Sequence, residues 1–314
     1  MTLTIGVDVG GTKVLAAVVD PNGTVIAETR RDTPAENVAG TLATIVEVIR
    51  ELAAGRTVEA VGIGAAGWID EQRATVLFAP NLAWKAEPLR DKVAAEVDLP
   101  VVVENDANVA GWAEYRFGAA ESVDNMVLLT VGTGIGGAIV LAGNLVRGAH
   151  GIAAELGHVL AVPDGYQCGC GRLGCLEQYA SGRALVREAK RNAETTPDKA
   201  AELLARAGGD PERIDGPAVT DAARAGDPAA LAAFADVGYW LGTGMADLVQ
   251  VLDPEMIVVG GGVIEAGELL LGPAREACAA ALPQRSRLPY TQIRAAEMGP
   301  HAGVVGASDL ARRR

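Results

Sequence analysis

The amino-acid sequence predicts an α/β protein built from two similar halves around a cleft, and three observations support this fold class. A pattern of strand, glycine-rich turn, strand, turn and strand occurs twice, at residues 2–29 and 126–148. Each copy is followed by helical stretches that alternate with short apolar strands, which is typical of α/β folds. The chain of 314 residues is also long enough for two domains, each with its own core.

The first copy carries a glycine turn between two strands. An apolar strand ends at Asp8, the turn Gly10-Gly11-Thr12-Lys13 follows, and the next residues are again β-rich. P-loops and Rossmann loops open a helix, so neither fits this pattern. A glycine turn between strands can still bind phosphate through backbone N–H groups, the Thr12 hydroxyl and the Lys13 ammonium. The alternative is an ordinary turn.

The second copy, with Gly132-Thr133-Gly134 in its turn, favours phosphate binding over an ordinary turn. Two such loops in a duplicated fold would face each other across a cleft and meet the two ends of a triphosphate. This is the architecture of the actin-like and hexokinase-like ATPases, and we expect that fold. The expected domains are a small one of residues 1–112, completed by a C-terminal helix at 301–314, and a large one of residues 113–300 with a metal-binding loop.

Two stretches between the copies bear on the chemistry. Thr33 to Glu36 has the pattern of a capping box and predicts a helix that runs to about Ala54. The apolar strand Val101 to Val103 ends shortly before Asn105-Asp106. Asp106 is either a helix N-cap or a general base at the carboxyl end of a strand. Context favours the base, because an ATP site needs a group that deprotonates the acceptor hydroxyl.

Two further loops expose backbone to a ligand. Gly67 ends a run of small residues after a strand, which lets a ligand approach closely. Gly260-Gly261-Gly262 follows the apolar strand from Met256. This turn could let an adenine ring lie flat on the backbone, and the alternative is ordinary packing of a strand against the next helix.

The loop from residue 155 to 177 gathers three of the four cysteines and one of the three histidines. His158, Cys168, Cys170 and Cys175 form a ligand set that suits tetrahedral zinc, and four protein ligands leave no open position, so the zinc would be structural. The alternative is reduced thiols in a glycine-rich surface loop. A zinc module that binds nucleic acid is disfavoured by the net charge of −13.

Composition limits the partners and the location. The acidic balance, with a pI near 4.8, disfavours nucleic acid and anionic membranes. No apolar run approaches the ~18 residues of a membrane span, and no signal peptide precedes the strand that begins at Leu3, so we expect a cytoplasmic protein. We also expect a homo-oligomer, a dimer or a tetramer.

The motifs together resemble one family over essentially the whole chain. The segments that carry the resemblance are DVGGTK at 8–13, ENDAN at 104–108, TVGTGIGG at 130–137, ELGH at 155–158 and CGCGRLGCLE at 168–177. They are similar to those of the ROK sugar kinases, and among these the bacterial glucokinases. The resemblance implies transfer of the γ-phosphoryl group of Mg-ATP to the 6-hydroxyl of glucose. One departure is Ala154, where many relatives have Gly before the Glu.

The resemblance also implies roles for individual residues. Asp106 would be the catalytic base, and Asp8 would order a water bound to Mg²⁺. The residues implied around the sugar are Gly67, Asn105, Asp106, Glu155, His158 and Glu177. Those implied at the nucleotide are Asp8, Gly10, Gly11, Thr12, Lys13, Thr133, Gly134, Gly260, Gly261 and Gly262. Those implied as structural zinc ligands are His158, Cys168, Cys170 and Cys175.

Other activities within the family stay open on the sequence alone. An N-acetylhexosamine kinase, a fructokinase and a polyphosphate-dependent glucokinase would share the same motifs. A sugar-sensing transcriptional regulator would carry a helix-turn-helix segment before the sugar site. Here the first hairpin begins at Leu3, and the acidic charge does not suit DNA.

Overall fold

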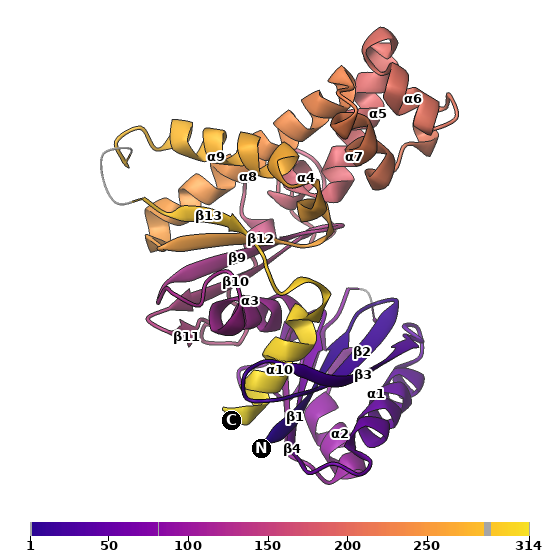
Figure 1. Ribbon diagram of the computed structural model, residues 1–314, viewed down its shortest axis with the longest axis vertical. Helices are drawn as coiled ribbons and strands as arrows, with labels where there is room; N and C mark the ends of the chain where they lie inside the picture. The colour runs from indigo at the N-terminus through magenta and orange to yellow at the C-terminus, as the bar shows by residue number, and fades with distance from the viewer. Residues whose placement is uncertain (1, 81, 286–289, 314) are drawn as a thin grey trace. The chain divides into compact units, whose positions relative to one another are not determined.

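The computed structural model of the protein describes residues 2–80, 82–285 and 290–313 (Figure 1). The chain forms two compact units. The first unit contains Met1–Leu128, Ala138–Ala154 and Glu297–Arg314, and the second contains Leu129–Gly137 and Glu155–Ala296. The units interleave along the chain rather than dividing it once, and the predicted domains of residues 1–112 and 113–300 stay a prediction. No helix in the described part of the chain combines the length and the apolar character that a membrane span needs.

The first unit is organised on a five-stranded sheet. Its strands lie in the order β3 (Val25–Asp32), β2 (Lys13–Val19), β1 (Leu3–Val9), β4 (Val58–Ala65) and β8 (Val101–Asn105). β1 and β3 pair antiparallel with β2, whereas β1–β4 and β4–β8 are parallel pairs. The helices of this unit are α1 (Val38–Ala53), α2 (Leu89–Val97), α3 (Asp106–Phe117) and α10 (Ala302–Arg312).

Both faces of this sheet are buried, as the continuous apolar sequence of β2 indicates. Val14, Ala16 and Val18 share one apolar cluster with residues of α1 and α2. Leu15, Ala17 and Val19 share another with residues of α3 and α10. α10 lies close to the strands because Gly6 has no side chain there: a Cβ on Gly6 would overlap the carbonyl oxygen of Val304.

The second sheet repeats the plan of the first. Its strands lie in the order β11 (Asn144–Leu145), β10 (Ile135–Leu141), β9 (Met126–Val131), β12 (Met256–Gly260) and β13 (Gln292–Ala295). As in the first sheet, an antiparallel hairpin pair stands at one edge and a parallel pair at the other. The predicted duplicated fold is therefore confirmed. β13 has no counterpart among the predicted strands.

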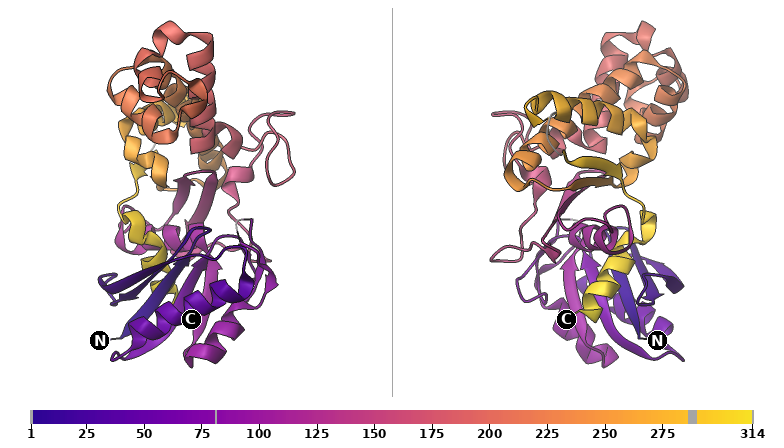
Figure 2. Two further views of the ribbon diagram at one scale, coloured as in Figure 1. Left: turned by 90° about the vertical axis from the view of Figure 1, so that its right-hand side faces the viewer. Right: turned by 60° about the vertical axis from the view of Figure 1, so that its left-hand side comes forward.

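The helices of the second unit lie between Glu177 and Ala281. They are α4 (Glu177–Ala180), α5 (Gly182–Thr195), α6 (Ala201–Arg206), α7 (Gly216–Arg224), α8 (Pro228–Leu252) and α9 (Glu268–Ala281). The long helix α8 is largely apolar and is capped by Asp227. Figure 2 shows that the loop before α4 folds back on itself, so that two segments run side by side. The isolated β-bridges Leu160↔Cys175 and Gln167↔Leu173 join these segments.

Two local features differ from the sequence prediction. The capping box at Thr33 is wrong: α1 begins at Val38, and Asn37 is its N-cap, with its side chain accepting from Gly40 N. Thr33 instead bonds to Gly10 in the first glycine turn. A small sheet of β5 (Trp68–Ile69), β6 (Val76–Phe78) and β7 (Lys85–Glu87) was not predicted, since its strands are two or three residues long.

Candidate active site

Asp106 lies where β8 ends and α3 begins. The N-cap of α3 is Asn105, whose Oδ1 accepts from Asn108 N at 3.0 Å, so the N-cap interpretation of Asp106 is wrong. Asp106 Oδ1 instead accepts from Ala107 N at 3.0 Å and from Asn105 Nδ2 at 3.1 Å. Burial raises the pKa of Asp106, and these hydrogen bonds oppose the shift in part. A carboxylate with a fixed direction and a raised pKa can accept a proton from a substrate hydroxyl.

Glu104 anchors the strand end that carries Asn105 and Asp106. Its side chain is 1% exposed, and Oε1 accepts from Asn105 N at 2.9 Å and from Asn108 Nδ2 at 3.0 Å. Oε2 forms ion pairs with Arg147 Nε at 2.6 Å and Arg73 Nε at 3.1 Å. Two arginines compensate one buried carboxylate, which would otherwise be costly. Sequence reasoning missed this cluster because the arginines come from distant segments.

Gly67 joins the same group. Its backbone has φ of 135°, which favours glycine, and a Cβ would overlap the carbonyl oxygen of Phe78. Its own carbonyl accepts from Asn105 Nδ2 at 3.0 Å. The structure therefore brings together three of the predicted sugar residues, Gly67, Asn105 and Asp106.

Asp8 at the end of β1 lies within electrostatic reach of Asp106. The pKa of Asp8 is raised to about 6, mainly by burial and also by the charge of Asp106, and the charge of Lys13 opposes both effects. Carboxylate oxygens of this kind are ligands that suit Mg²⁺. The predicted role of Asp8 toward a magnesium ion is compatible with this arrangement and stays a prediction.

The first glycine turn is held by Thr33. Gly10 N donates to Lys13 O at 3.0 Å, which closes the turn. Thr33 Oγ1 donates to Gly10 O at 2.8 Å, and Thr33 N donates to Thr12 O at 3.1 Å. Thr33, which directly follows β3, thus donates hydrogen bonds to the carbonyl groups of Gly10 and Thr12 in the turn. Thr12 is exposed, and Gly11 and Lys13 are partly exposed.

The second glycine turn is held by the start of α5. Gly132 N donates to Gly134 O at 3.0 Å, and Gly182 N donates to Gly132 O at 2.8 Å. Thr133 is exposed at the tip of the turn. Gly134 lies against Glu177, because a Cβ on Gly134 would overlap Glu177 Oε2. A predicted nucleotide residue and a predicted sugar residue are thus direct neighbours within the second unit.

The third glycine turn lies beside the second one. Gly261 has φ of 85°, and a Cβ there would overlap the carbonyl oxygen of Val131 at the end of β9. A Cβ on Gly182 would lie 2.8 Å from Gly132 O and 3.1 Å from Val263 Cγ2, so both turns meet the start of α5. Gly261 and Gly262 are exposed, whereas Gly260 is buried. The exposed backbone of two neighbouring turns is a surface that a nucleotide can occupy.

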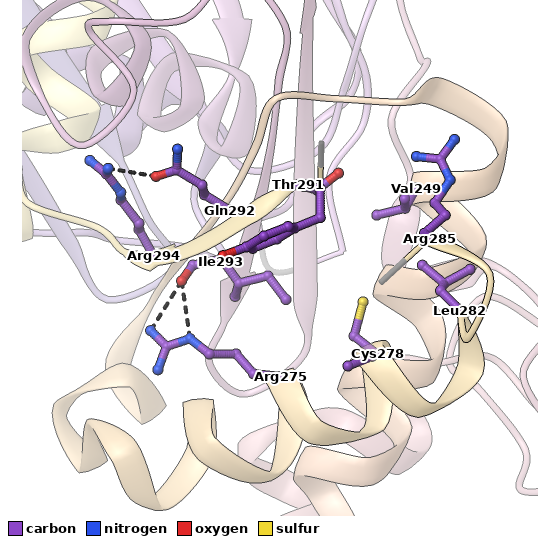
Figure 3. Close-up of a pocket in the computed structure, with 11 residues that line it drawn as sticks. Val249, Arg275, Cys278, Leu282, Arg285, Thr291, Gln292, Ile293 and Arg294 are labelled. Carbon is purple, nitrogen blue, oxygen red and sulfur yellow. Dashed lines mark hydrogen bonds between the residues drawn. The ribbon is translucent and has the colours of Figure 1, made fainter. Parts of the chain in front are cut away.

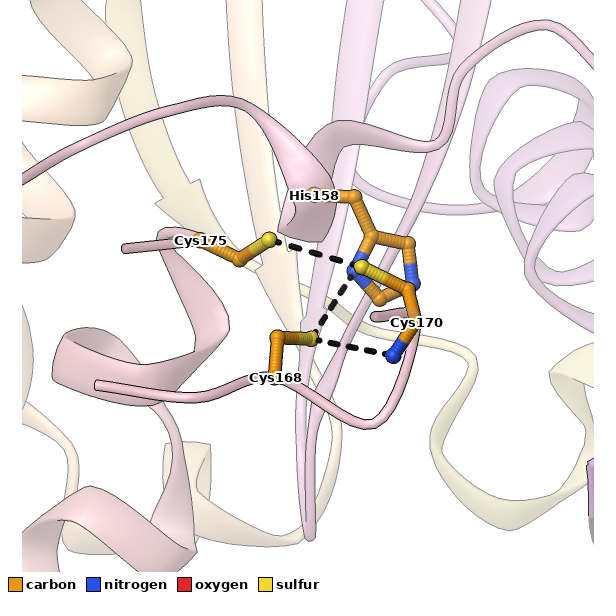
Figure 4. Close-up of side chains that lie close together, drawn as sticks. All are labelled: His158, Cys168, Cys170 and Cys175. Atoms are coloured by element: carbon orange, nitrogen blue, oxygen red, sulfur yellow. Dashed lines mark hydrogen bonds between the residues drawn. The ribbon is translucent and has the colours of Figure 1, made fainter. Parts of the chain in front are cut away.

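His158, Cys168, Cys170 and Cys175 converge at one point of the loop (Figure 4). One ligand atom from each lies within 4.8 Å of all the others. Cys170 Sγ is 3.6 Å from Cys175 Sγ, and Cys168 Sγ is 3.5 Å from His158 Nδ1. Sulfur ligands of a tetrahedral zinc ion lie about 3.8 Å apart, since each Zn–S bond is about 2.3 Å. These four residues therefore fit a structural zinc ion, as predicted.

Two carboxylates adjoin the cluster. Glu155 Oε2 lies 3.8 Å from His158 Nε2, the nitrogen away from Cys168, which is the usual place for a carboxylate that orients a metal-binding histidine. Cys168 Sγ donates to Glu177 Oε1 at 3.0 Å. Burial raises the pKa of the Cys168 thiol to about 12, so zinc binding must displace a proton from it.

Ala154 precedes this segment and has φ of 68°. This is the left-handed region, which glycine occupies at little cost and alanine does not. The position where the resemblance expects Gly is therefore one where the backbone favours Gly.

A cavity of about 580 Å³ lies between α8, α9 and β13 (Figure 3). Cys278 of α9 and Leu282, the residue after this helix, face it together with Ile293 of β13. Arg275 closes one side through a hydrogen bond from Nε to Ile293 O at 3.1 Å. Of the described residues that line this cavity, none belongs to the predicted sites, so we assign the cavity no part in catalysis.

Comparison with known proteins identifies the family. The sequence profile of the ROK family matches residues 4–314. A glucokinase of Streptomyces coelicolor is 48% identical over 314 residues, covering 99% of this chain and 98% of the relative. A glucokinase of Thermotoga maritima is 38% identical, covering 99% and 97%. The crystal structure of a ROK family glucokinase from Streptomyces griseus, in complex with glucose and AMPPNP, is 51% identical, covers 99% and 100% of the two chains, and superposes with a TM-score of 0.89. The chain belongs to the ROK family.

Proposed function

We propose that the protein is a glucokinase, which transfers the γ-phosphoryl group of ATP to the 6-hydroxyl of glucose. The observation that carries the proposal is the environment of Asp106, a carboxylate with a raised pKa held by Asn105 at the end of a strand. The names of the relatives support the choice of substrates, since full-length relatives at 48% and 38% identity are glucokinases. The Streptomyces griseus relative binds glucose together with an ATP analogue.

In this proposal Asp106 accepts the proton of the 6-hydroxyl as the oxygen forms its bond to the γ-phosphorus. The bond between the γ-phosphorus and the bridging oxygen breaks, and ADP leaves with that electron pair. Asn105 and Ala107 N hold Asp106 Oδ1, so the carboxylate does not need to reorient during the transfer. A Mg²⁺ ion bound with ATP, near Asp8, would neutralise phosphate charge.

The second unit would supply recognition of the sugar. We assign Glu155, His158 and Glu177 to the sugar hydroxyls, and carboxylates placed in this way reject analogues that leave them unpaired. Zinc held by His158 and the three cysteines would stabilise the loop that carries these residues. The glycine turns at Gly10–Lys13, Thr133–Gly134 and Gly260–Gly262 would bind the nucleotide. Association into a dimer or tetramer and a cytoplasmic location stay predictions.

A panel of acceptors and donors tests the proposal. Purified protein is assayed with glucose, fructose, N-acetylglucosamine and N-acetylmannosamine, each with Mg-ATP and with polyphosphate, by following the sugar phosphate formed. The expected result is the highest kcat/KM with glucose and ATP. A higher value for another hexose, or turnover that requires polyphosphate, would replace glucokinase by that activity.

A further inference from the structure

The second glycine turn has no positive charge of its own to offer a phosphate, and a carboxylate lies against it. The turn itself, Gly132-Thr133-Gly134, contains no basic residue. Its neighbour Glu177 is 9% exposed and lies against Gly134. A carboxylate this close to a phosphate site repels the ligand unless a cation compensates it. The first glycine turn, in contrast, ends in Lys13.

Arg183 is the cation that the fold brings to this turn. It is the second residue of α5, and its Nε donates to Thr133 O at 2.9 Å. Its Nη2 lies 3.9 Å from Glu177 Oε1, and 3.8 Å from where a Cβ on Gly134 would be. The side chain is 61% exposed. One edge of the guanidinium is therefore fixed on the turn while much of the group faces solvent.

We propose that Arg183 binds the phosphates of the donor nucleotide, an inference that rests on the proposed function. The hydrogen bond to Thr133 O places the guanidinium at the tip of the turn. Nη2 and Glu177 Oε1 form a long ion pair at 3.9 Å, which offsets the carboxylate and leaves the exposed N–H groups of the guanidinium for a phosphate. A guanidinium offers several N–H groups in one plane, which suits phosphate oxygens.

The charges of the other basic residues of α5 have partners of their own, carboxylates at hydrogen-bond distance or an aromatic ring. Arg187 donates to Gln178 O at 2.7 Å and lies 4.1 Å from the ring centre of Tyr166. Lys190 pairs with Glu212 at 2.9 Å. Arg191 pairs with Glu188 at 2.7 Å. The basic character of the helix as a whole is thus largely neutralised, and the inference concerns Arg183 alone.

The test separates phosphate binding from a structural role in the turn. Arg183→Gln, Arg183→Lys and wild type are titrated calorimetrically with Mg-ADP and with adenosine. Gln retains a donor for Thr133 O but loses the charge, and Lys retains the charge. We expect Arg183→Gln to bind ADP about tenfold or more weakly, adenosine as wild type does, and Arg183→Lys to lie between. Wild-type affinity of Arg183→Gln for ADP, or an equal loss for adenosine and ADP, would overturn the proposal.

Lys190→Gln is the matched control. It removes the same charge from the same helix at a residue that already has a carboxylate partner, so ADP affinity should stay unchanged. An equal loss in both variants would indicate a long-range effect of net charge and would also overturn the proposal. Failure of the proposed function is seen separately: wild type would then phosphorylate no glucose, whatever Arg183 does for ADP.

Discussion

The two glycine turns occupy equivalent places in two sheets of the same strand order, yet they are built differently. The first turn brings its own charges, because Asp8 precedes it and Lys13 ends it. The second turn has no charged residue. It acquires Glu177 and Arg183 from chain that folds back onto it, and Arg183 lies 50 residues from Thr133. The two turns therefore share a backbone arrangement, but their charged residues come from different parts of the chain.

The strand ends differ in the same way. β8 in the first sheet ends at Asn105, and Asp106 follows directly. β13 occupies the matching place in the second sheet, and it ends at Ala295 with another alanine after it. The candidate general base therefore belongs to the first unit alone. The metal loop belongs to the second, so the two units are expected to respond to mutation in different ways.

Asp106→Asn should have the largest effect. The amide keeps the size and most hydrogen bonds of the side chain but cannot accept the proton, so kcat should fall by about two to four decades. Glucose affinity, measured by calorimetry, should stay within a few fold of wild type. Turnover close to that of wild type would remove Asp106 as the base, and with it the asymmetry between the strand ends.

The pH dependence sharpens this prediction. The base must be ionised, so kcat/KM should fall as the pH drops through the pKa of Asp106, and the raised pKa places this acid limb above the ordinary value of about 3.9. The same shift destabilises the folded protein once the pH rises above that pKa. Asp106→Asn should therefore melt no lower than wild type at pH 7 to 8, and a lower melting temperature would contradict the burial argument.

Cys170→Ser should affect the second unit most. Cys170 is exposed whereas Cys168 and Cys175 are buried, so the change itself is tolerated but one zinc ligand is lost. Metal analysis should show loss of stoichiometric zinc, and glucose affinity should fall by about tenfold or more, because Glu155 and Glu177 flank the outer ligands. ADP affinity should fall less.

Cys278→Ser is the control for the zinc loop. Cys278 is a free cysteine in the cavity near β13, away from the cluster, so this variant should retain zinc and bind glucose normally. A zinc-free Cys170→Ser protein that binds glucose as wild type does would show that the metal loop does not organise the sugar site.

The contact of Gly134 with Glu177 revises what substitution in the second turn should do. If the turn contacted only the nucleotide, a Cβ on Gly134 would weaken ATP binding far more than glucose binding. In the structure that Cβ meets the Glu177 carboxylate, so Gly134→Ala should weaken both by about tenfold. Gly132→Ala in the same turn has no heavy atom within 4 Å of its Cβ and should weaken ADP alone. Both variants are titrated with ADP and with glucose. The same loss of glucose affinity in Gly132→Ala as in Gly134→Ala would contradict this difference.

The features that could be predicted from the sequence are those formed by residues close together in the chain. The zinc ligands, the glycine turns and the strand end before Asp106 are each short motifs, and the repeated hairpin predicts the duplicated sheets. Contacts between distant segments leave no such signal. Arg147 reaches Glu104 from the chain beyond the second hairpin, and no local pattern indicates that pairing.

Local patterns also misled where tertiary contacts compete with them. Thr33 has the spacing of a helix cap, but its hydroxyl bonds to Gly10 O and the cap passes to Asn37. β13 is four residues long and only partly apolar, which is too little for a periodicity to show. In both cases the local structure depends on a contact with a distant segment of the chain. The spacing of residues in the sequence does not indicate that contact.

Thr33→Val should have the smallest effect and tests the support of the first turn. It removes the hydroxyl that donates to Gly10 O and leaves the backbone bond to Thr12 O. The loss of one such hydrogen bond costs about 1 kcal/mol, or about fivefold in the KM for ATP, with the KM for glucose unchanged. Thr33→Ser keeps the hydroxyl and should match wild type.

The two turns can then be compared directly. Because the first turn has Lys13 within it, loss of the Thr33 hydrogen bond should weaken nucleotide binding less than Arg183→Gln does at the second turn. The reverse order would mean that backbone shape, and not charge, limits how the two turns bind phosphate.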